Sequence, residues 1–377
     1  MNKEVKVVIG ANYGDEGKGL VSYCLAYEAA KQGRKILNVF FNGGMQRAHT
    51  SGGEILHCSG AGSSFGADTF YHPKFIVDPI ALWLERPRGK IFIDPRCRVV
   101  VPEDVVNNRR LELARQKTYS HHGSCGMGIF ECVKRSRRVE FDLRWQDCVN
   151  EKPQTLYEKL TKIGMEYGWP RDILYNHENW MQAVQWCREN TGMVQFSDLT
   201  KDQDYDTIIF EGGQGLLLDQ RNVADFPHLT PSCTGVHNIV DDVKSLGLTP
   251  ELYYVSRSYA TKHGMGFLKW ACNKEDIDPS IVDTTNEPNP WQGSLQFGKL
   301  SIPELHERVQ KDADELNIAK KINLVYTHLN YTNGRLTTKD LTTIGTNSKN
   351  GFTPIEKPDW CNHVYGSDAK DFMDILM

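Results

Sequence analysis

The sequence predicts an α/β protein built on a large, mainly parallel central sheet with flanking helices. Three observations support this fold class. Val5–Ile9 is a β-rich run, Leu20–Gln32 has helical spacing that Gly33 ends, and Ile36–Phe41 is a second apolar run. A strand, a helix and a strand in succession make a βαβ unit, whose two strands run parallel.

Further short apolar runs extend this sheet along the chain. Each is followed by a glycine-rich or polar loop, which is where α/β enzymes carry their chemistry. The runs are Phe75–Val77, Lys90–Ile93, Thr207–Phe210, Leu252–Val255 and Ile322–Tyr326. We expect residues 1–377 to form a single domain with a helical insertion around 145–200, and residues 340–358 to form a loop or edge strands.

Composition excludes several classes of protein. Lys and Arg number 44 against 48 Asp and Glu, giving a net charge of −4, so direct nucleic-acid binding is not expected. No apolar run reaches the roughly 18 residues of a membrane span, and the N-terminus leads straight into a strand instead of a signal peptide. Ten scattered cysteines without a C-x-x-C pair are typical of reduced thiols. We therefore expect a cytoplasmic protein.

The first candidate site is Gly14–Gly19, G-D-E-G-K-G, between the first strand and the first helix. Backbone N–H groups of a glycine loop, a helix N-terminus and Lys18 together make an anion site suited to phosphate. The glycine spacing is tighter than in a Walker loop, and Gly19 replaces the Ser or Thr that would hold Mg²⁺. Asp15 offers an oxygen ligand in its place. The alternative is a glycine turn with incidental charges.

Two further loops follow strands in the same way. Asn42–Thr50, N-G-G-M-Q-R-A-H-T, comes directly after the second strand. If the first two strands are adjacent and parallel, both loops lie at one sheet edge, and His49 faces Asp15 across a phosphate. The third segment, Phe210–Asp219, runs from a strand into glycines and the polar Gln214.

These three segments resemble, in order, the signature regions of adenylosuccinate synthetase: W-G-D-E-G-K-G, G-G-x-N-A-G-H-T and F-E-G-A-Q-G-x-L-L-D. The similarity runs from residue 5 to about 335 and includes Leu56–Gly60, Val77–Pro79, Phe226–Thr230, Ser258–Lys262, Thr284-Thr285 and Val325–Asn330, with a weaker match at Gly366-Ser367. The resemblance implies a homodimer with a P-loop-type fold. Members of the family transfer a γ-phosphoryl group to the purine O6 and then let the aspartate amine displace phosphate at C6.

The resemblance also implies roles for individual residues. Asp15 would remove the N1 proton and bind Mg²⁺ together with the Ala48 carbonyl, while His49 and Lys18 would stabilise charge on the phosphoryl group. Triphosphate contacts would come from Gly14, Glu16, Gly17, Lys18, Gly19, Thr50, Thr327, His328, Asn330 and Gly366. Purine-monophosphate contacts would come from Asp15, Gln46, Ser124, Arg138, Gln214 and Thr230, and aspartate contacts from Thr284, Thr285 and Gln292. An arginine from 135–138 would reach the partner subunit's site.

The nucleotide-base motif departs from the family pattern. The family has Thr-Lys-x-Asp, whose carboxylate accepts hydrogen bonds from guanine N1–H and N2–H₂. Here the stretch is Thr327-His328-Leu329-Asn330. An Asn amide has one acceptor and one donor, which suits the adenine edge but leaves a guanine donor unpaired at about 1–3 kcal/mol. The sequence therefore predicts ATP or dATP as the donor, with a relaxed site that still uses GTP as the alternative.

The aspartate loop departs as well. The family has roughly T-T-T-G-R-x-R-R, whereas residues 284–293 contain no arginine. In the family that loop binds the aspartate carboxylate and lies near the ribose 2′-OH, so its loss indicates a deoxynucleotide substrate. Gln46 and the pair Arg47-Ala48 replace the family's Asn and two small residues. The 120–128 segment replaces its S-T-G-x-G-I-G-P loop, with Ser124 as the matching residue.

Together these departures resemble the phage-associated branch of the family. Its members condense dGMP with L-aspartate to N6-succino-2-amino-2′-deoxyadenylate, on the route to 2-aminoadenine DNA. Many of them have serine in place of the aspartate of the phosphate loop, whereas this chain keeps that aspartate as Asp15. The sequence thus predicts an ATP-dependent, Mg²⁺-requiring ligase acting on dGMP, in host cytoplasm if phage-encoded. The alternatives are an ordinary synthetase using IMP with GTP or ATP, a non-catalytic nucleotide-binding relative, and a P-loop kinase, which Gly19 disfavours.

Overall fold

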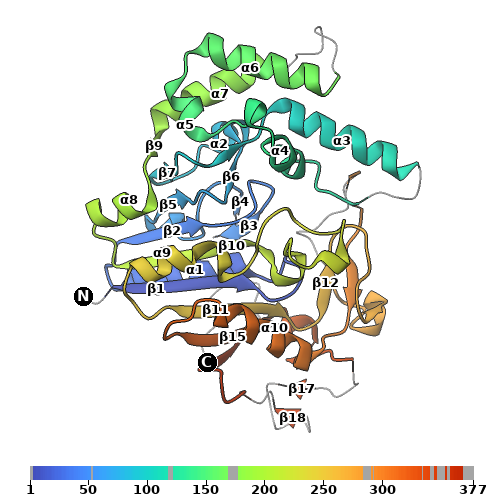
Figure 1. Cartoon of the computed structure of the whole chain (residues 1–377). Helices are drawn as coiled ribbons and strands as arrows, with labels where there is room; N and C mark the ends of the chain where they lie inside the picture. Colours follow the sequence, from blue (N-terminus) through green and yellow to red (C-terminus); the bar gives the residue numbers. More distant parts are fainter. Residues whose placement is uncertain are drawn as a thin grey trace.

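A nine-stranded parallel sheet runs through the middle of the computed structural model (Figure 1). Its order is β19-β15-β11-β1-β10-β2-β5-β7-β9, and each neighbouring pair is parallel. This confirms the predicted α/β fold with a large parallel sheet. The structure describes residues 3–51, 54–117, 122–168, 177–282, 290–291, 293–332, 334–339, 344–345, 353–354 and 357–367.

The strands of the large sheet are β1 (Glu4–Gly10), β2 (Ile36–Phe40), β5 (Asp68–Tyr71), β7 (Ile91–Ile93), β9 (Thr191–Met193), β10 (Thr207–Gly215), β11 (Glu251–Arg257), β15 (Lys321–Thr327) and β19 (His363–Gly366). Smaller sheets contain β3 (His49–Ser51) and β4 (Glu54–Leu56), β6 (Ile76–Val77) and β8 (Arg98–Val99), β12 (Ala260–Lys262), β13 (Ala271–Cys272) and β14 (Gln296–Gly298), and β16 (Arg335–Leu336), β17 (Ile344–Gly345) and β18 (Thr353–Pro354).

Two expectations about strand pairing are wrong. The run at Phe75–Val77 contributes β6, which lies outside the large sheet: it pairs with β8, and Ile76 bridges to Gly44. After two strand residues Asp78 caps the following helix with its carboxylate. The first two strands are not adjacent either, since β10 lies between β1 and β2 and pairs with both. Its run Ile208–Phe210 is buried, which suits a strand with a neighbour on each side.

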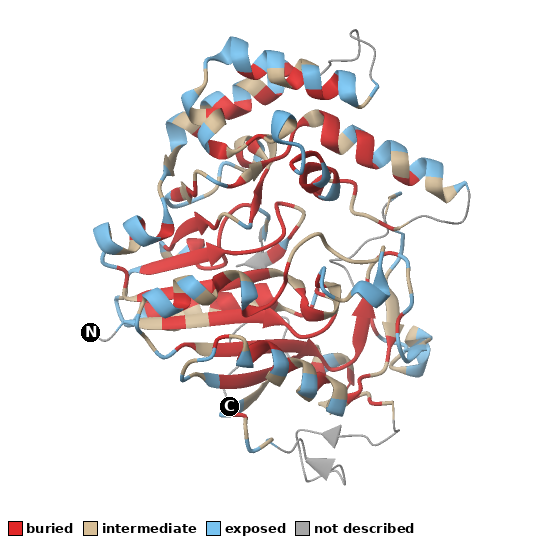
Figure 2. Cartoon of the chain, viewed as in Figure 1, coloured by how far each residue is buried: buried red, intermediate tan, exposed pale blue. Residues whose placement is uncertain are grey.

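Helices cover both faces of the sheet. Val7 of β1 belongs to one hydrophobic cluster together with Leu305 of α10 (Ile302–Asp314), on the face that also carries α9 (Val240–Ser245). Val8 belongs to another, together with Val21 of α1 (Lys18–Lys31). Alternate residues of one strand thus serve two cores, and Figure 2 shows the central strands buried over most of their length.

A helical layer extends the molecule beyond the β7–β9 edge (Figure 1). Trp145 and Trp180 are fully buried within it, and Trp180 Nε1 donates to the Val100 carbonyl at 2.9 Å. A buried ion pair of 2.9 Å between Arg135 and Asp104 joins two of its helices. The layer contains α2 (Pro79–Glu85), α3 (Pro102–Gln116), α4 (Ile129–Arg135), α5 (Trp145–Asn150), α6 (Pro153–Glu166) and α7 (His177–Asn190), and α8 (Phe196–Asp202) follows β9.

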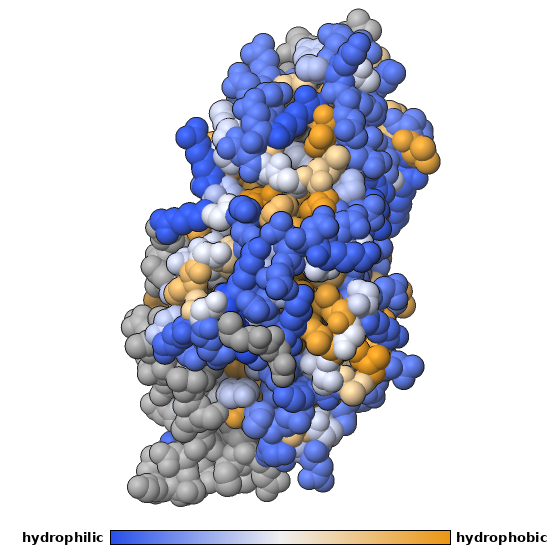
Figure 3. Space-filling model, turned by 90° about the vertical axis from the view of Figure 1, so that its left-hand side faces the viewer, coloured by the Kyte–Doolittle hydropathy of each residue, from blue (hydrophilic) through white to orange (hydrophobic). Residues whose placement is uncertain are grey.

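Among the described residues, no helix is both long enough and apolar enough to cross a membrane. Figure 3 shows the face at the amino ends of the strands as mainly hydrophilic, with small separate apolar patches. Single exposed apolar residues of this kind are normal for folded proteins.

Asp312 of α10 gives the fold a pH-dependent contribution to stability. Its buried carboxyl group accepts hydrogen bonds from the Tyr254 hydroxyl at 2.8 Å and from the Val236 amide at 3.2 Å. Burial raises the pKa of Asp312 from 3.8 to about 7. The folded state therefore holds a proton that the unfolded chain releases, so this stabilisation is complete below pH 3.8 and declines up to about pH 7, by about 1.4 kcal/mol per pH unit.

We expect Asp312→Asn to become more stable relative to the wild type as the pH rises through this window, because the amide cannot ionise. The difference in the free energy of unfolding should level off above about pH 7. Urea denaturation at a series of pH values measures it. Asp314→Asn, at an exposed position on the same helix, serves as the control. A pH-independent difference for Asp312→Asn would refute the assignment.

Candidate active site

The predicted loops meet around one cavity of about 1300 Å³ at the carboxyl edge of the sheet. Its wall comes from the loops after β1, β2, β10, β11 and β15, with residues 122–131 on the opposite side. Parallel strands bring their carboxyl ends to one edge, which is why distant segments converge here. The predicted residues that line it are Gly14, Asp15, Glu16, Gly17, Lys18, Gly19, Gln46, Ala48, His49, Ser124, Gln214, Thr230, Thr327, His328 and Asn330.

Other predicted residues lie elsewhere. Gly366 ends β19, and its neighbour Ser367 lines the cavity instead. Arg138 is exposed outside the cavity of its own chain and pairs with Glu140 and Glu166. The side chain of Thr50 and the residues Thr284, Thr285 and Gln292 fall outside the described part of the chain.

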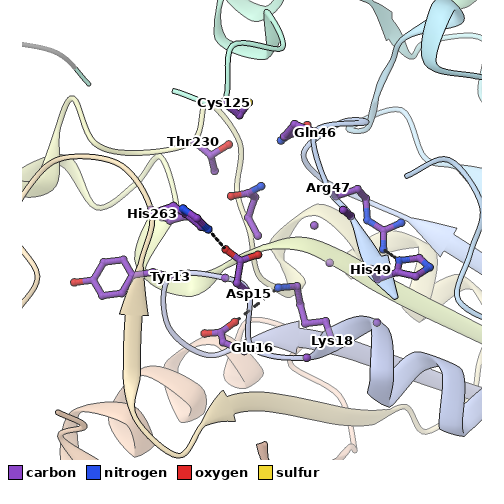
Figure 4. A pocket seen from close by; sticks show the side chains of 18 of the residues that line it. Tyr13, Asp15, Glu16, Lys18, Gln46, Arg47, His49, Cys125, Thr230 and His263 are labelled. Carbon is purple, nitrogen blue, oxygen red and sulfur yellow. Dashed lines mark hydrogen bonds and ion pairs between the residues drawn. The ribbon is translucent and has the colours of Figure 1, made fainter. Parts of the chain in front are cut away.

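The Gly14–Gly19 loop contains a buried carboxylate, that of Glu16. Gly10 must be glycine, because a Cβ there would lie 2.0 Å from Glu16 Oε2. Lys18 Nζ is 3.7 Å from the same oxygen. Burial raises the pKa of Glu16, and the Lys18 ammonium opposes that rise. The pair therefore fixes the Lys18 ammonium beside the cavity (Figure 4).

Gly19 is explained by its neighbour across the loop. A Cβ at this position would lie 2.2 Å from His49 Cβ. The Ser or Thr of an ordinary Walker loop cannot be placed there without moving His49. His49 follows the loop of β2 and is 8% exposed, so it has little room to shift.

A buried cluster of Arg47, His49 and Glu211 forms one side of the cavity. Arg47 Nη2 makes an ion pair with Glu211 and lies 2.9 Å from His49 Nδ1, while Glu211 Oε1 is 3.4 Å from the same nitrogen. The Arg47 guanidinium also lies 3.6 Å from the centroid of the Phe40 ring. Burial raises the pKa of Glu211, but the charge of the Arg47 guanidinium opposes this effect and the pKa is lowered.

Asp15 lies at the opening of the glycine loop, with its side chain 44% exposed toward the cavity (Figure 4). Its backbone has a φ of 55°, in the left-handed region. Oδ2 is 3.3 Å from His263 Nε2, and the Asp15 carbonyl accepts a hydrogen bond from Arg257 Nε at 2.6 Å. In Figure 4 the Lys18 ammonium lies beside Asp15, and the His49 ring lies further along the wall, against Arg47.

Helix α3 holds the 122–128 segment against the cavity. Glu112 accepts hydrogen bonds from the His122 and Gly123 amides at 2.6 and 2.7 Å. Asn108 Nδ2 donates to Ser124 Oγ at 3.0 Å. These contacts place the Ser124 side chain in the wall, opposite the glycine loop.

The far end of the cavity is lined by side chains that follow β15. Thr327 Oγ1 donates to the Glu16 carbonyl at 2.7 Å, which ties β15 to the glycine loop. Asn330 is exposed, and the rings of His328 and Tyr331 lie 6.3 Å apart at 26°. This end therefore presents an amide and two nearly parallel rings, groups that suit a flat heterocycle.

Several polar atoms in the wall lack hydrogen-bond partners within the described part of the chain. Buried polar atoms are normally satisfied, so such a set marks a place for a polar ligand. The atoms are Glu16 Oε2, Gln46 Oε1, His49 Nε2, His228 Nδ1 and Ser367 Oγ.

Sequence reasoning missed Arg47, Glu211 and His263 as site residues. Glu211 belongs to the third signature segment, and Arg47 is two residues from His49, so the sequence alone could have identified both as site residues. His263 directly follows Ser258–Lys262, but its approach to Asp15 joins positions 248 residues apart and depends on packing alone.

The family model described as adenylosuccinate synthetase matches residues 7–288. The chain belongs to the adenylosuccinate synthetase family. Members of that family are ligases that form a carbon–nitrogen bond, and the cavity described above lies among the family's signature segments.

Two curated relatives are 25% and 29% identical to this adenylosuccinate synthetase family member over the aligned residues. The adenylosuccinate synthetase of Thermoplasma acidophilum is 25% identical over 343 residues, covering 83% of this chain and 74% of the relative. That of Neisseria gonorrhoeae is 29% identical over 253 residues, covering 60% of this chain and 55% of the relative. The chain thus spans about three quarters of the first relative's length and about half of the second's.

Two solved structures share the fold. A fully ligated adenylosuccinate synthetase from Plasmodium falciparum has a TM-score of 0.67 at 19% identity, covering 87% of this chain and 77% of that one. The succinoaminodeoxyadenylate synthetase of cyanophage S-2L, PurZ, bound to dGMP and dATP as an energy donor, has a TM-score of 0.63 at 15% identity, covering 88% and 86%. At these identities the likeness concerns the fold of the family.

The contact between Gly19 and His49 leads to a prediction. Gly19→Ala should displace His49 and lower kcat/KM for phosphate release by about 100-fold, since a shift of about 1 Å at a reacting group has that effect. Gly33→Ala, beyond the other end of α1, is the control: no atom lies within 4 Å of its Cβ, and its φ of 68° should cost only about 1 kcal/mol of stability. Equal activities of the two variants would show that the contact has no catalytic consequence.

Proposed function

We propose that the protein is an ATP-dependent ligase that joins L-aspartate to C6 of dGMP. The products are N6-succino-2-amino-2′-deoxyadenylate, ADP and phosphate. The observation that carries the reaction type is the convergence of Asp15, Lys18 and His49 on one cavity in a member of this ligase family. Support for dGMP comes from the arginine-free segment 284–293, and support for ATP as the donor comes from Asn330 in the base motif.

In the first step the purine O6 becomes the nucleophile. The Asp15 carboxylate takes the N1 proton, and the electron pair moves to O6. O6 then forms a bond to the γ-phosphorus while the bond between that phosphorus and the β–γ bridging oxygen breaks, which releases ADP. Lys18 and His49 offset the charge that develops on the phosphoryl oxygens.

In the second step the aspartate amine attacks C6. The C6–N bond forms, the C6–O6 bond breaks, phosphate leaves with O6, and the amine loses a proton. Thr284, Thr285 and Gln292 are the proposed contacts of the aspartate carboxylates. Gln46, Ser124, Gln214 and Thr230 are the proposed contacts of the purine monophosphate.

The chain offers suitable oxygen ligands for Mg²⁺. The half-exposed Asp15 carboxylate and the Ala48 carbonyl both belong to the cavity wall. The described residues contain no group of three or more acidic, His or Cys side chains placed to hold a metal, which fits an ion that takes one or two protein oxygens plus phosphates and water. When bound, Mg²⁺ would neutralise charge on the transferred phosphoryl group.

The triphosphate would lie along Gly14–Gly19, with its base at the end formed by Thr327, His328 and Asn330. Gly366 and Thr50 are further proposed contacts. We also propose a homodimer in which an arginine reaches the partner's substrate. Arg135 is buried and paired with Asp104 in its own chain, so Arg137 and Arg138, both exposed, are the candidates for this role; Arg138 would have to exchange its pairs with Glu140 and Glu166.

Phosphate release with ATP, Mg²⁺ and L-aspartate tests the proposed reaction, with dGMP and IMP compared in parallel. We expect kcat/KM for dGMP to exceed that for IMP by at least about tenfold, the effect of one lost polar contact. Turnover on IMP alone would make the protein an ordinary synthetase. Release that does not depend on aspartate would indicate a kinase, and no release with any purine monophosphate would indicate a non-catalytic relative.

The base-reading role of Asn330 gives a second prediction. Asn330→Asp should lower the ratio of kcat/KM for ATP to that for GTP by about tenfold or more, because a carboxylate accepts both guanine donors and repels the adenine N1 lone pair. Asn190→Asp, exposed on α7 and remote from the cavity, adds the same charge as a control. An unchanged ratio in Asn330→Asp would refute this reading of the base site.

A further inference from the structure

We propose that Arg47 is a positioning residue that holds His49 as the neutral tautomer with its hydrogen on Nε2. The residue stands where the family pattern has a small one, so this arrangement belongs to this chain. The inference deepens the proposed function and rests on it only for the acceptor that Nε2 would meet.

The hydrogen-bond chemistry of the two side chains fixes the tautomer. Arg47 Nη2 lies 2.9 Å from His49 Nδ1. A guanidinium has only donors and stays charged, so Nδ1 must accept this hydrogen bond through its lone pair. An uncharged imidazole with a lone pair on Nδ1 carries its hydrogen on Nε2.

Glu211 does not reverse this assignment. Its Oε1 is 3.4 Å from His49 Nδ1, beyond the usual N–H···O range of about 2.7–3.2 Å, and the same oxygen is bound by Arg47 Nη2. Arg47 is itself held in place, because its guanidinium lies 3.6 Å from the centroid of the Phe40 ring and the residue is 7% exposed. Arg47 Nη2 therefore contacts both the carboxylate and the imidazole, and it is the closer neighbour of Nδ1.

The tautomer leaves a hydrogen-bond donor at the cavity. His49 lines the cavity, and its Nε2 is buried without a partner among the described residues. A buried N–H group without an acceptor costs about 1–3 kcal/mol, and an anionic oxygen on a ligand would satisfy it. In the proposed reaction that oxygen belongs to the phosphoryl group.

The tautomer is measured directly by ¹⁵N NMR of enzyme labelled at histidine, without substrate and well above the ordinary pKa of histidine. His49→Gln identifies the signals of His49. We expect a pyridine-type shift for Nδ1 and a pyrrole-type shift for Nε2. The opposite pair of shifts in the wild type would overturn the proposal. Because no substrate is present, this result does not depend on whether dGMP is the substrate.

Variants of Arg47 test the cause. Arg47→Lys keeps a donor-only cation and should keep the wild-type shifts. Arg47→Ala lets Nδ1 donate to Glu211 and should move the hydrogen to Nδ1. Arg47→Met, which keeps an apolar contact with Phe40 and has no N–H donor, replaces it if Arg47→Ala does not fold. Arg96→Ala, which removes an arginine paired with Asp94 outside the cavity, is the matched control and should change nothing at His49. Wild-type shifts in Arg47→Ala or Arg47→Met would show that Arg47 does not set the tautomer.

Turnover then tests the consequence. With whichever purine monophosphate the enzyme accepts, Arg47→Ala should lower kcat by at least about tenfold while KM for the nucleotides stays within about threefold, since one donor to the transferred group is lost. Arg47→Lys should recover most of kcat. A normal kcat in a variant whose hydrogen has moved would overturn the link between the tautomer and the reaction.

Discussion

The positions of the two loops that carry Asp15 and His49 depend on strand β10, which pairs with β1 on one side and with β2 on the other. This arrangement places the carboxyl end of β10 between the two loops that carry Asp15 and His49. Glu211 therefore stands beside the loop of β2, where it binds Arg47. If β1 and β2 were direct neighbours, no carboxylate would be available at that point.

The cavity wall is electrostatically matched. Three carboxylates in it have basic partners: Glu16 has Lys18 of the same loop, Glu211 has Arg47, and Asp15 has His263. Burying ions is costly unless they are paired, and such pairs add little to stability compared with apolar residues of the same size. Their value here lies in placing charge near a ligand.

Much of the fold and site follows from local sequence patterns. The glycine loop, the Asn42–Thr50 loop and the Phe210–Asp219 segment were placed correctly because each joins a short apolar run to glycines and polar residues. The order of the strands could not be predicted from the sequence, because the pairing of strands far apart in the chain depends on register and on burial of both faces. The contact of Asp15 with His263 was missed for the same reason.

Gly19, His49 and Arg47 restrict one another. Gly19 leaves the space that His49 occupies, the imidazole accepts a hydrogen bond from Arg47, and Arg47 needs Glu211 to balance its charge. A substitution at one of these positions therefore alters the contacts of the other two, and the free-energy effects of combined substitutions will not be additive. This linkage gives a reason why residues 46–48 differ from the family pattern while Asp15, Lys18 and His49, the proposed reacting groups, match it: the substituted residues would alter how those groups are held.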